Sequence, residues 1–143
     1  PYVLSRQASY MVTVRDGQGG INQDTVTLSV SGAAGPFTVT SPNNNATFSG
    51  VHNVTWNVAN TSPVMAALVN IRLSTDGGLT YPTILIANTL NDGSESVVLP
   101  NINTSTARIK VEAVGNIFWD ISNFNFTIEP FVSAVSDWQL YGS

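Results

Sequence analysis

Apolar and polar residues alternate along most of this chain, a pattern that predicts β-strands. Near the N-terminus, residues 10–15 and residues 25–30 both alternate in this way. Between them lies Asp-Gly-Gln-Gly-Gly at 16–20, whose glycines supply the positive-φ positions of a hairpin loop. Residues 10–31 are therefore predicted to form one β-hairpin.

A denser series of short alternating segments follows residue 36. These segments cover residues 37–40, 53–58, 68–73, 83–86, 95–99, 107–114, 117–121 and 124–128. Each is bounded by Gly, Pro, Asn or Asp, and no stretch of ten residues shows the period of a helix. The predicted fold is all-β: an immunoglobulin/fibronectin-III-like antiparallel β-sandwich preceded by an extra β-hairpin.

The small residues Ser-Gly-Ala-Ala-Gly-Pro at 31–36 have the composition of an inter-domain linker. We expect the hairpin and linker at 1–35, the sandwich at 36–129 and a tail at 130–143. The tail is either a docked edge strand or the start of another module. Because a two-stranded hairpin is not stable alone, it must pack on the sandwich, on the tail or on something outside this chain. An unpaired hairpin also permits exchange between molecules, so a domain-swapped homodimer is a candidate assembly.

Charged residues are scarce, at 10% of the chain against roughly 25% in an average soluble domain. The chain has no cysteine and one histidine, His52, which excludes disulfide frameworks, thiolate metal sites and zinc sites with two or more histidines. Five basic residues are spread along a chain of net charge −4, which argues against a nucleic-acid partner. No apolar run is long enough for a membrane span. With so few ionisable groups, the sequence favours a chain that binds something and is not an enzyme.

The most specific local pattern runs from residue 74 to residue 81. Ser74, Asp76, Gly78, Thr80 and Tyr81 fit the S-x-D-x-G-x-T-aromatic signature of the Asp-box hairpin known from sialidases and many secreted β proteins. The aspartate can accept backbone N–H groups across the turn, the glycine permits the tight path, and the tyrosine packs beneath. We interpret these five residues as a structural turn. The alternative makes Asp76 a calcium ligand or a catalytic acid.

Other carboxylates lie at or near predicted turns. They are Asp16, Asp24, Asp92, Glu95 and Asp120. Oxygen ligands of this kind bind calcium, but the spacing of a calcium-binding loop is absent, and isolated turn aspartates usually form Asx turns. We predict no catalytic, cofactor-binding or metal-binding residue, and calcium is the one cofactor left open. A small hydrolase that uses two turn carboxylates is the enzyme alternative.

Aromatic side chains offer a route to sugar ligands, because exposed indole rings stack on pyranose faces. Trp56 alternates with Val54 and Val58 and is predicted to lie in the core. The candidate ligand-binding residues are therefore Trp119 and Trp138. His52 opens the strand of Trp56 and is expected to face solvent or to form a hydrogen bond.

Several segments also occur in the order found in a known module. They are Gly-Pro-Phe-Thr-Val-Thr-Ser-Pro at 35–42, Val-Thr-Trp-Asn-Val at 54–58, Val-Asn-Ile-Arg-Leu-Ser-Thr-Asp-Gly-Gly at 69–78, Asn-Asp-Gly-Ser-Glu-Ser at 91–96, Ala-Arg-Ile-Lys-Val-Glu-Ala-Val-Gly-Asn-Ile-Phe at 107–118, Asp-Ile-Ser at 120–122 and Asn-Phe-Thr-Ile at 125–128. Together they resemble the C-terminal sandwich module that follows the catalytic domain in secreted bacterial reprolysin-like zinc metallopeptidases. Residues 13–20 resemble the last two strands of the bacterial Ig-like or cadherin-like domain that precedes that module.

The resemblance implies an extracellular or cell-surface protein whose zinc ligands and catalytic glutamate lie elsewhere, since this chain lacks their histidine-rich motif. We therefore expect a non-catalytic accessory module that spaces or positions a catalytic domain or engages its protein substrate. The alternative is a carbohydrate- or cell-surface-binding module. The expected partners are the parent catalytic domain or a protein or polysaccharide surface.

Overall fold

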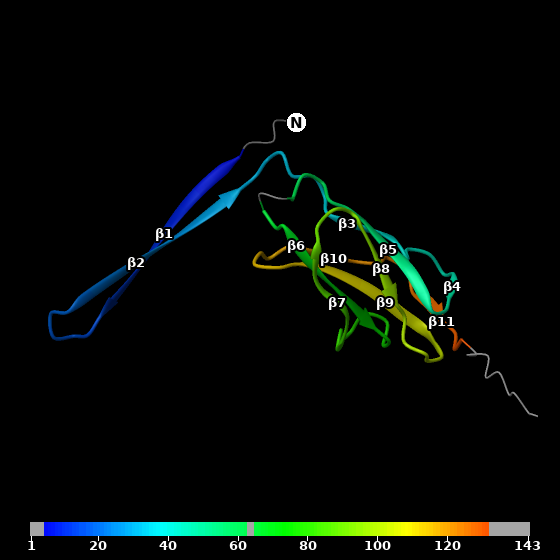
Figure 1. The fold of residues 1–143 in the computed structure, drawn as a ribbon. Helices are drawn as coiled ribbons and strands as arrows, with labels where there is room; N and C mark the ends of the chain where they lie inside the picture. The colour runs from blue at the N-terminus through cyan, green and yellow to red at the C-terminus, as the bar shows by residue number, and fades with distance from the viewer. Residues whose placement is uncertain (1–4, 63–64, 132–143) are drawn as a thin grey trace, which may run out of the picture. The chain divides into compact units, whose positions relative to one another are not determined.

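The computed structural model describes residues 5–62 and 65–131 (Figure 1). All regular elements in these residues are strands: β1 (Arg6–Arg15), β2 (Ile21–Val30), β3 (Thr38–Ser41), β4 (Thr47–Phe48), β5 (Val51–Asn57), β6 (Leu68–Ser74), β7 (Thr83–Leu90), β8 (Ser94–Val98), β9 (Thr104–Ala113), β10 (Trp119–Ile121) and β11 (Phe126–Ile128). The chain divides into two compact units, Pro1–Pro36 and Phe37–Ser143. The division lies one residue from the predicted boundary. Trp138 and the predicted tail beyond residue 131 lie outside the described residues.

The first unit contains the predicted hairpin. Strands β1 and β2 pair antiparallel without a register shift, from Arg6 opposite Val30 to Arg15 opposite Ile21. The carboxylate of Asp16 closes the loop, because its Oδ1 accepts hydrogen bonds from the backbone N–H groups of Gln18 and Gly20 at 2.8 and 2.9 Å. The hairpin is therefore confirmed, with β1 beginning four residues earlier than the alternation predicts.

The two faces of the hairpin differ in polarity. The register places Ala8, Tyr10, Val12, Val14, Val26, Leu28 and Val30 on one face, which is largely apolar. The other face carries mainly Gln, Ser and Thr side chains. The apolar face is exposed, with Tyr10 and Val14 accessible over 60% and 63% of their surface.

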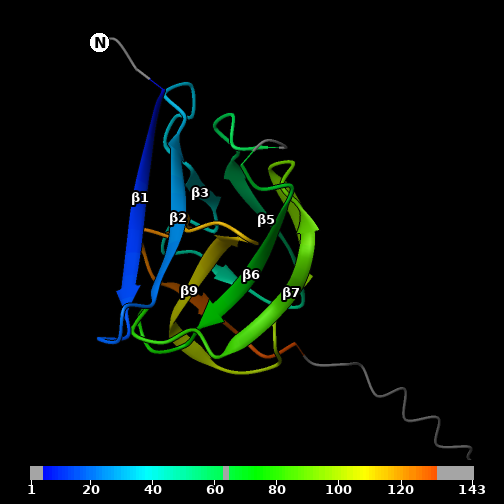
Figure 2. The ribbon, with the colours of Figure 1, turned by 90° about the vertical axis from the view of Figure 1, so that its left-hand side faces the viewer.

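The second unit holds two sheets. One has three strands in the order β3-β5-β8, and the other has the order β4-β11-β9-β6-β7 with β10 also paired to β9. Figure 2 shows β6 lying between β9 and β7. All pairs are antiparallel except β4 with β11, which run parallel at Thr47 opposite Thr127. The two-residue β4 was not predicted from the sequence, because so short a segment shows no alternation.

The core of this unit draws on both sheets, which gives the two layers of a β-sandwich. Its buried residues from the smaller sheet and the segment after β8 are Val39, Val54, Trp56, Val97 and Leu99. Those from the larger sheet are Val69, Ile71, Leu73, Ala107, Ile109, Val111, Phe126 and Ile128. Each set alternates along its strands with outward side chains, as the sequence pattern predicts.

Trp56 lies in this core as predicted, with 4% of its surface accessible. Its Nε1–H donates to Asn91 Oδ1 at 2.9 Å, which satisfies the one polar atom of the buried ring. His52 lies four residues before Trp56 on β5 and packs against Phe48, with ring centroids 4.1 Å apart. Its Nε2 lies 3.4 Å from Ser41 Oγ, and partial burial lowers the pKa of the imidazole. His52 is therefore half-buried and hydrogen-bonded, one of its two expected states.

Candidate functional site

The outward face of the larger sheet gathers polar and aromatic side chains from three strands. Because Ile71, Ile109 and Val111 point into the core, their neighbours along β6 and β9 point outward. These outward residues, with the paired residue of β10, are Asn70, Arg72, Arg108, Lys110, Glu112 and Trp119. We call this set the Trp119 face.

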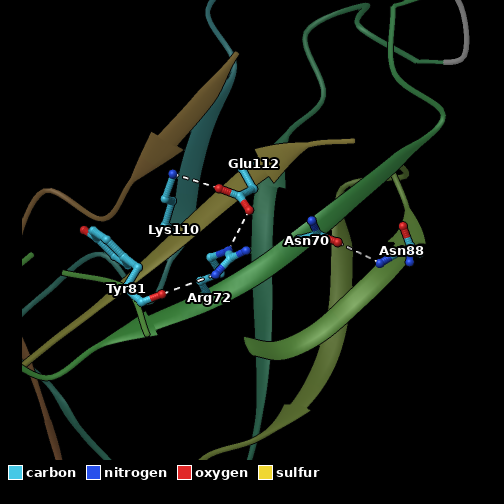
Figure 3. A network of polar contacts seen from close by, with 6 residues as sticks. All are labelled: Asn70, Arg72, Tyr81, Asn88, Lys110 and Glu112. Atoms are coloured by element: carbon cyan, nitrogen blue, oxygen red, sulfur yellow. Dashed lines mark hydrogen bonds and ion pairs between the residues drawn. The ribbon is translucent and has the colours of Figure 1, made fainter. Parts of the chain in front are cut away.

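An ion-paired row crosses the Trp119 face from β6 to β9 (Figure 3). Arg72 Nε donates to Glu112 Oε1 at 2.6 Å, and Lys110 Nζ lies 2.7 Å from Glu112 Oε2. Burial alone would raise the pKa of Glu112, but the hydrogen bonds and positive charges of Lys110 and Arg72 outweigh it and lower the pKa. Glu112 is therefore held ionised between two cations.

Two outward side chains of β6 are held by further hydrogen bonds. On one side, Arg72 Nη1 donates to the carbonyl oxygen of Tyr81 at 3.4 Å. On the other, Asn70 Oδ1 accepts the backbone N–H of Asn88 at 2.9 Å, and Asn88 has the positive φ of 56° that asparagine tolerates (Figure 3). These bonds restrict the side chains of Arg72 and Asn70.

Trp119 lies beside this row. It stands opposite Glu112 in the β9–β10 ladder, and 55% of its surface is accessible. Lys110 Nζ lies 5.0 Å from the indole centroid and 5.9 Å from the ring centroid of Tyr81. Cation–π attraction therefore orients the lysine between two rings. The predicted ligand-binding residue is exposed and sits next to fixed polar groups.

The turn that follows β6 has the local geometry expected of an Asp box. Asp76 Oδ1 accepts hydrogen bonds from Ser74 Oγ and from the backbone N–H groups of Leu79 and Thr80, at 2.6, 3.0 and 3.0 Å. Its Oδ2 accepts Thr80 Oγ1–H at 2.6 Å. These bonds, led by those from the Ser74 and Thr80 hydroxyls, hold the pKa of Asp76 far below its usual range. The carboxylate is engaged within its own turn, which fits the structural interpretation.

Gly78 and Tyr81 complete this turn. Gly78 has a φ of 93°, and a Cβ there would lie 3.0 Å from Tyr81 Oη and 3.1 Å from Arg108 Cδ. The backbone conformation therefore favours glycine, and a Cβ would require the Tyr81 or Arg108 side chain to shift by a few tenths of an ångström. The Tyr81 hydroxyl is buried without a hydrogen-bond partner among the described residues, and burial raises its pKa.

The other turn carboxylates are dispersed and hydrogen-bonded. The backbone N–H groups of Thr25, Ser94 and Val39 donate to Asp24, Asp92 and Asp120 at 2.8, 3.3 and 2.7 Å. Glu95 accepts from the hydroxyl of Thr89 and from its neighbour's backbone N–H. Among the described residues, no group of three or more His, Cys, Asp or Glu side chains could hold a metal ion. In the part of the chain that the structure describes, these candidates therefore form no cluster that could hold a metal ion.

The sequence did not reveal the ion-paired row. The alternation at residues 70–72 and 108–112 shows that these side chains face outward, but it does not show that β6 and β9 are neighbours. Arg72 and Glu112 are 40 residues apart, and their contact depends on strand register. The basic residues are spread along the sequence, yet the strand register brings Arg72, Arg108 and Lys110 to one side of this sheet.

The fold and the site define an all-β protein of antiparallel sheets with an exposed aromatic and polar face. Comparisons with known protein families, with curated proteins and with solved structures find no match to this chain. In the described part of the chain, no helix is long and apolar enough to cross a membrane.

Proposed function

We propose that this chain is a non-catalytic accessory module of a larger secreted protein and that it binds carbohydrate through the Trp119 face. The observation that carries the proposal is the 55% exposure of Trp119 beside the fixed Arg72–Glu112–Lys110 row. A flat indole can stack on a sugar ring, and neighbouring donors and acceptors can then bond its hydroxyl groups. The geometry thus favours carbohydrate over the other expected partners.

The engagement of the turn carboxylates supports a non-catalytic role. Asp76, the carboxylate of the most specific motif, accepts four hydrogen bonds within one turn. Its lowered pKa makes it a poor general acid or base near neutral pH. Glu112 is likewise occupied by two cations. These two carboxylates are therefore poorly suited to the small-hydrolase alternative.

The setting that we propose is a secreted bacterial metallopeptidase, in which the sandwich spaces or positions the catalytic domain. Support comes from the sequence resemblance and from the division into two units. In this setting the second unit is an immunoglobulin/fibronectin-III-like sandwich, and the hairpin supplies the last two strands of a preceding β-domain. The exposed apolar face of the hairpin fits that role, because the other strands of such a domain would cover it.

Affinity electrophoresis through gels that contain a panel of neutral and acidic polysaccharides tests the carbohydrate proposal. The chain should be retarded by at least one polymer, and Trp119→Ala should weaken that binding about tenfold, the scale of one aromatic contact. Phe124→Ala is the matched control, because Phe124 is a comparably exposed aromatic residue at 53%. Retardation by no polymer, or equal retardation of the wild type and Trp119→Ala, would overturn the proposal.

A further inference from the structure

All lysine and arginine side chains of the described sandwich lie on one side of one sheet. They are Arg72, Arg108 and Lys110, and the remaining two basic residues of the chain, Arg6 and Arg15, belong to the hairpin. Arg108 and Lys110 project outward from β9, and Arg72 projects outward from β6. In a chain of net charge −4 this is a local concentration of positive charge.

The strand register places two of these cations directly opposite each other. Arg72 pairs with Lys110 in the β6–β9 ladder, an arrangement in which like charges repel and weaken the sheet. Glu112 contacts both and offsets part of the repulsion. Two positive charges then stand against one negative charge in this row. A second anion near the row would relieve the remaining repulsion.

Arg108 is the cation that no acidic group balances. Its Nε donates to Asn125 Oδ1 at 2.7 Å, and no carboxylate of the described residues lies within ion-pair distance of it. Asp76 and Asp120 are nearby acids, since both raise the pKa of Tyr81 electrostatically while Arg108 lowers it. Both carboxylates already accept hydrogen bonds, Asp76 within its turn and Asp120 from the backbone N–H of Val39. A guanidinium presents several donors in one plane, a geometry that suits a carboxylate or sulfate group.

The cations and the exposed indole form one continuous strip. Trp119 stands opposite Glu112. Arg108 lies four residues before Glu112 on β9, so the two positions are about 13 Å apart along the strand at 3.3 Å per residue. A strip of this length matches a chain of several sugars better than a single small molecule. The stacking ring at one end favours a pyranose over an acidic peptide, which has no flat apolar face to place there.

We propose that the ligand of the Trp119 face is an anionic polysaccharide whose carboxylate or sulfate groups bind Arg108 and Arg72 while a sugar ring stacks on Trp119. This inference rests on the proposed carbohydrate binding and narrows its ligand. It also explains why a protein with so few charges places three of its cations together.

The test compares polymers that differ only in charge. Polygalacturonate is paired with its methyl ester, and dextran sulfate with dextran, in affinity gels at low and high salt. The acidic member of at least one pair should bind about tenfold more tightly, and the difference should shrink at high salt because exposed charges are screened. Arg108→Gln, which retains a donor for Asn125 and leaves the Arg72–Glu112–Lys110 row intact, should weaken this binding about three- to tenfold.

The matched control is Arg15→Gln, which removes the same charge from the hairpin and should leave binding unchanged. Equal binding of both members of a pair, lost in Trp119→Ala, would overturn the anionic ligand and leave the carbohydrate proposal standing. Binding of polyglutamate as tight as that of the acidic polysaccharides, unaffected by Trp119→Ala, would indicate an acidic peptide site and overturn the inference. Binding of no polymer would overturn the inference together with the proposed function.

Discussion

The buried amide of Asn91 allows a quantitative test of how the segment between β5 and β6 is held to the core. Asn91 directly follows β7, and 3% of its surface is accessible. Its Oδ1 accepts the indole N–H of Trp56 at 2.9 Å. Its Nδ2 donates to Thr61 Oγ1 and to the carbonyl oxygen of Ala66, both at 3.0 Å. One side chain thus joins the core tryptophan to two points of that segment.

Asn91→Ala removes these three hydrogen bonds and leaves their partners in a buried site. A buried hydrogen bond contributes a net of about 1 kcal/mol, and an unsatisfied partner adds to the loss. We therefore expect the free energy of unfolding to fall by about 3 kcal/mol, a large share of the roughly 5–15 kcal/mol typical of a folded domain. The indole of Trp56 should also become more mobile, because its only polar anchor is gone.

Urea unfolding followed by tryptophan fluorescence measures this loss. Asn103→Ala, at an exposed position, is the matched control and should change the free energy by less than about 0.5 kcal/mol. The comparison is valid where the denaturant slopes of the variants agree. A loss below about 1 kcal/mol for Asn91→Ala would refute the reasoning, since the three bonds would then contribute almost nothing.

Three further predictions concern stability. Folding lowers the pKa of the Asp76 and Glu112 carboxyl groups. The stability that they contribute is therefore fully present above their unfolded pKa values near 4. It is lost as pH falls through the lower pKa values of the folded state. Thermal melts should show a Tm that decreases below about pH 4, and less steeply in Asp76→Asn; identical slopes would contradict the role of Asp76. Added calcium or EDTA should leave the Tm unchanged, because the described carboxylates are dispersed, and a rise of several degrees with calcium would show a bound ion. A chain that begins at Phe37 should melt at the temperature of the sandwich in the full chain, because all core residues lie beyond Pro36; a decrease of about 5 °C or more would show that the hairpin stabilises it.

Local patterns made much of the fold predictable. Alternation along a strand directly encodes which side chains face inward, so the sequence placed Trp56 in the core and most strands within a few residues. The turn at Asp76 was equally predictable, because every hydrogen bond of the Asp76 carboxylate links residues no more than four positions apart. Such features depend on neighbours in the sequence.

The ion-paired row shows what local patterns leave out. Whether Arg72 meets Lys110 or another residue depends on which strands are adjacent and on their register, and a shift by one residue would turn these side chains to the other face. Trp119 was identified from the sequence as a candidate exposed aromatic residue, whereas its contact with Lys110 was not predictable. The sequence therefore predicted one residue of the candidate site, Trp119, but not the group of side chains that surrounds it.

The hairpin has a consequence for how this protein behaves at high concentration. Both β1 and β2 are unpaired on their outer edges among the described residues, and each offers ten residues in continuous register. Such long, regular edges pair readily with the same edges of other molecules, especially beside an exposed apolar face. Few charges interrupt them, since Asp24 is the one charged residue between the ends of either strand. Self-association and aggregation of this chain should therefore begin at the hairpin, while the sandwich remains folded.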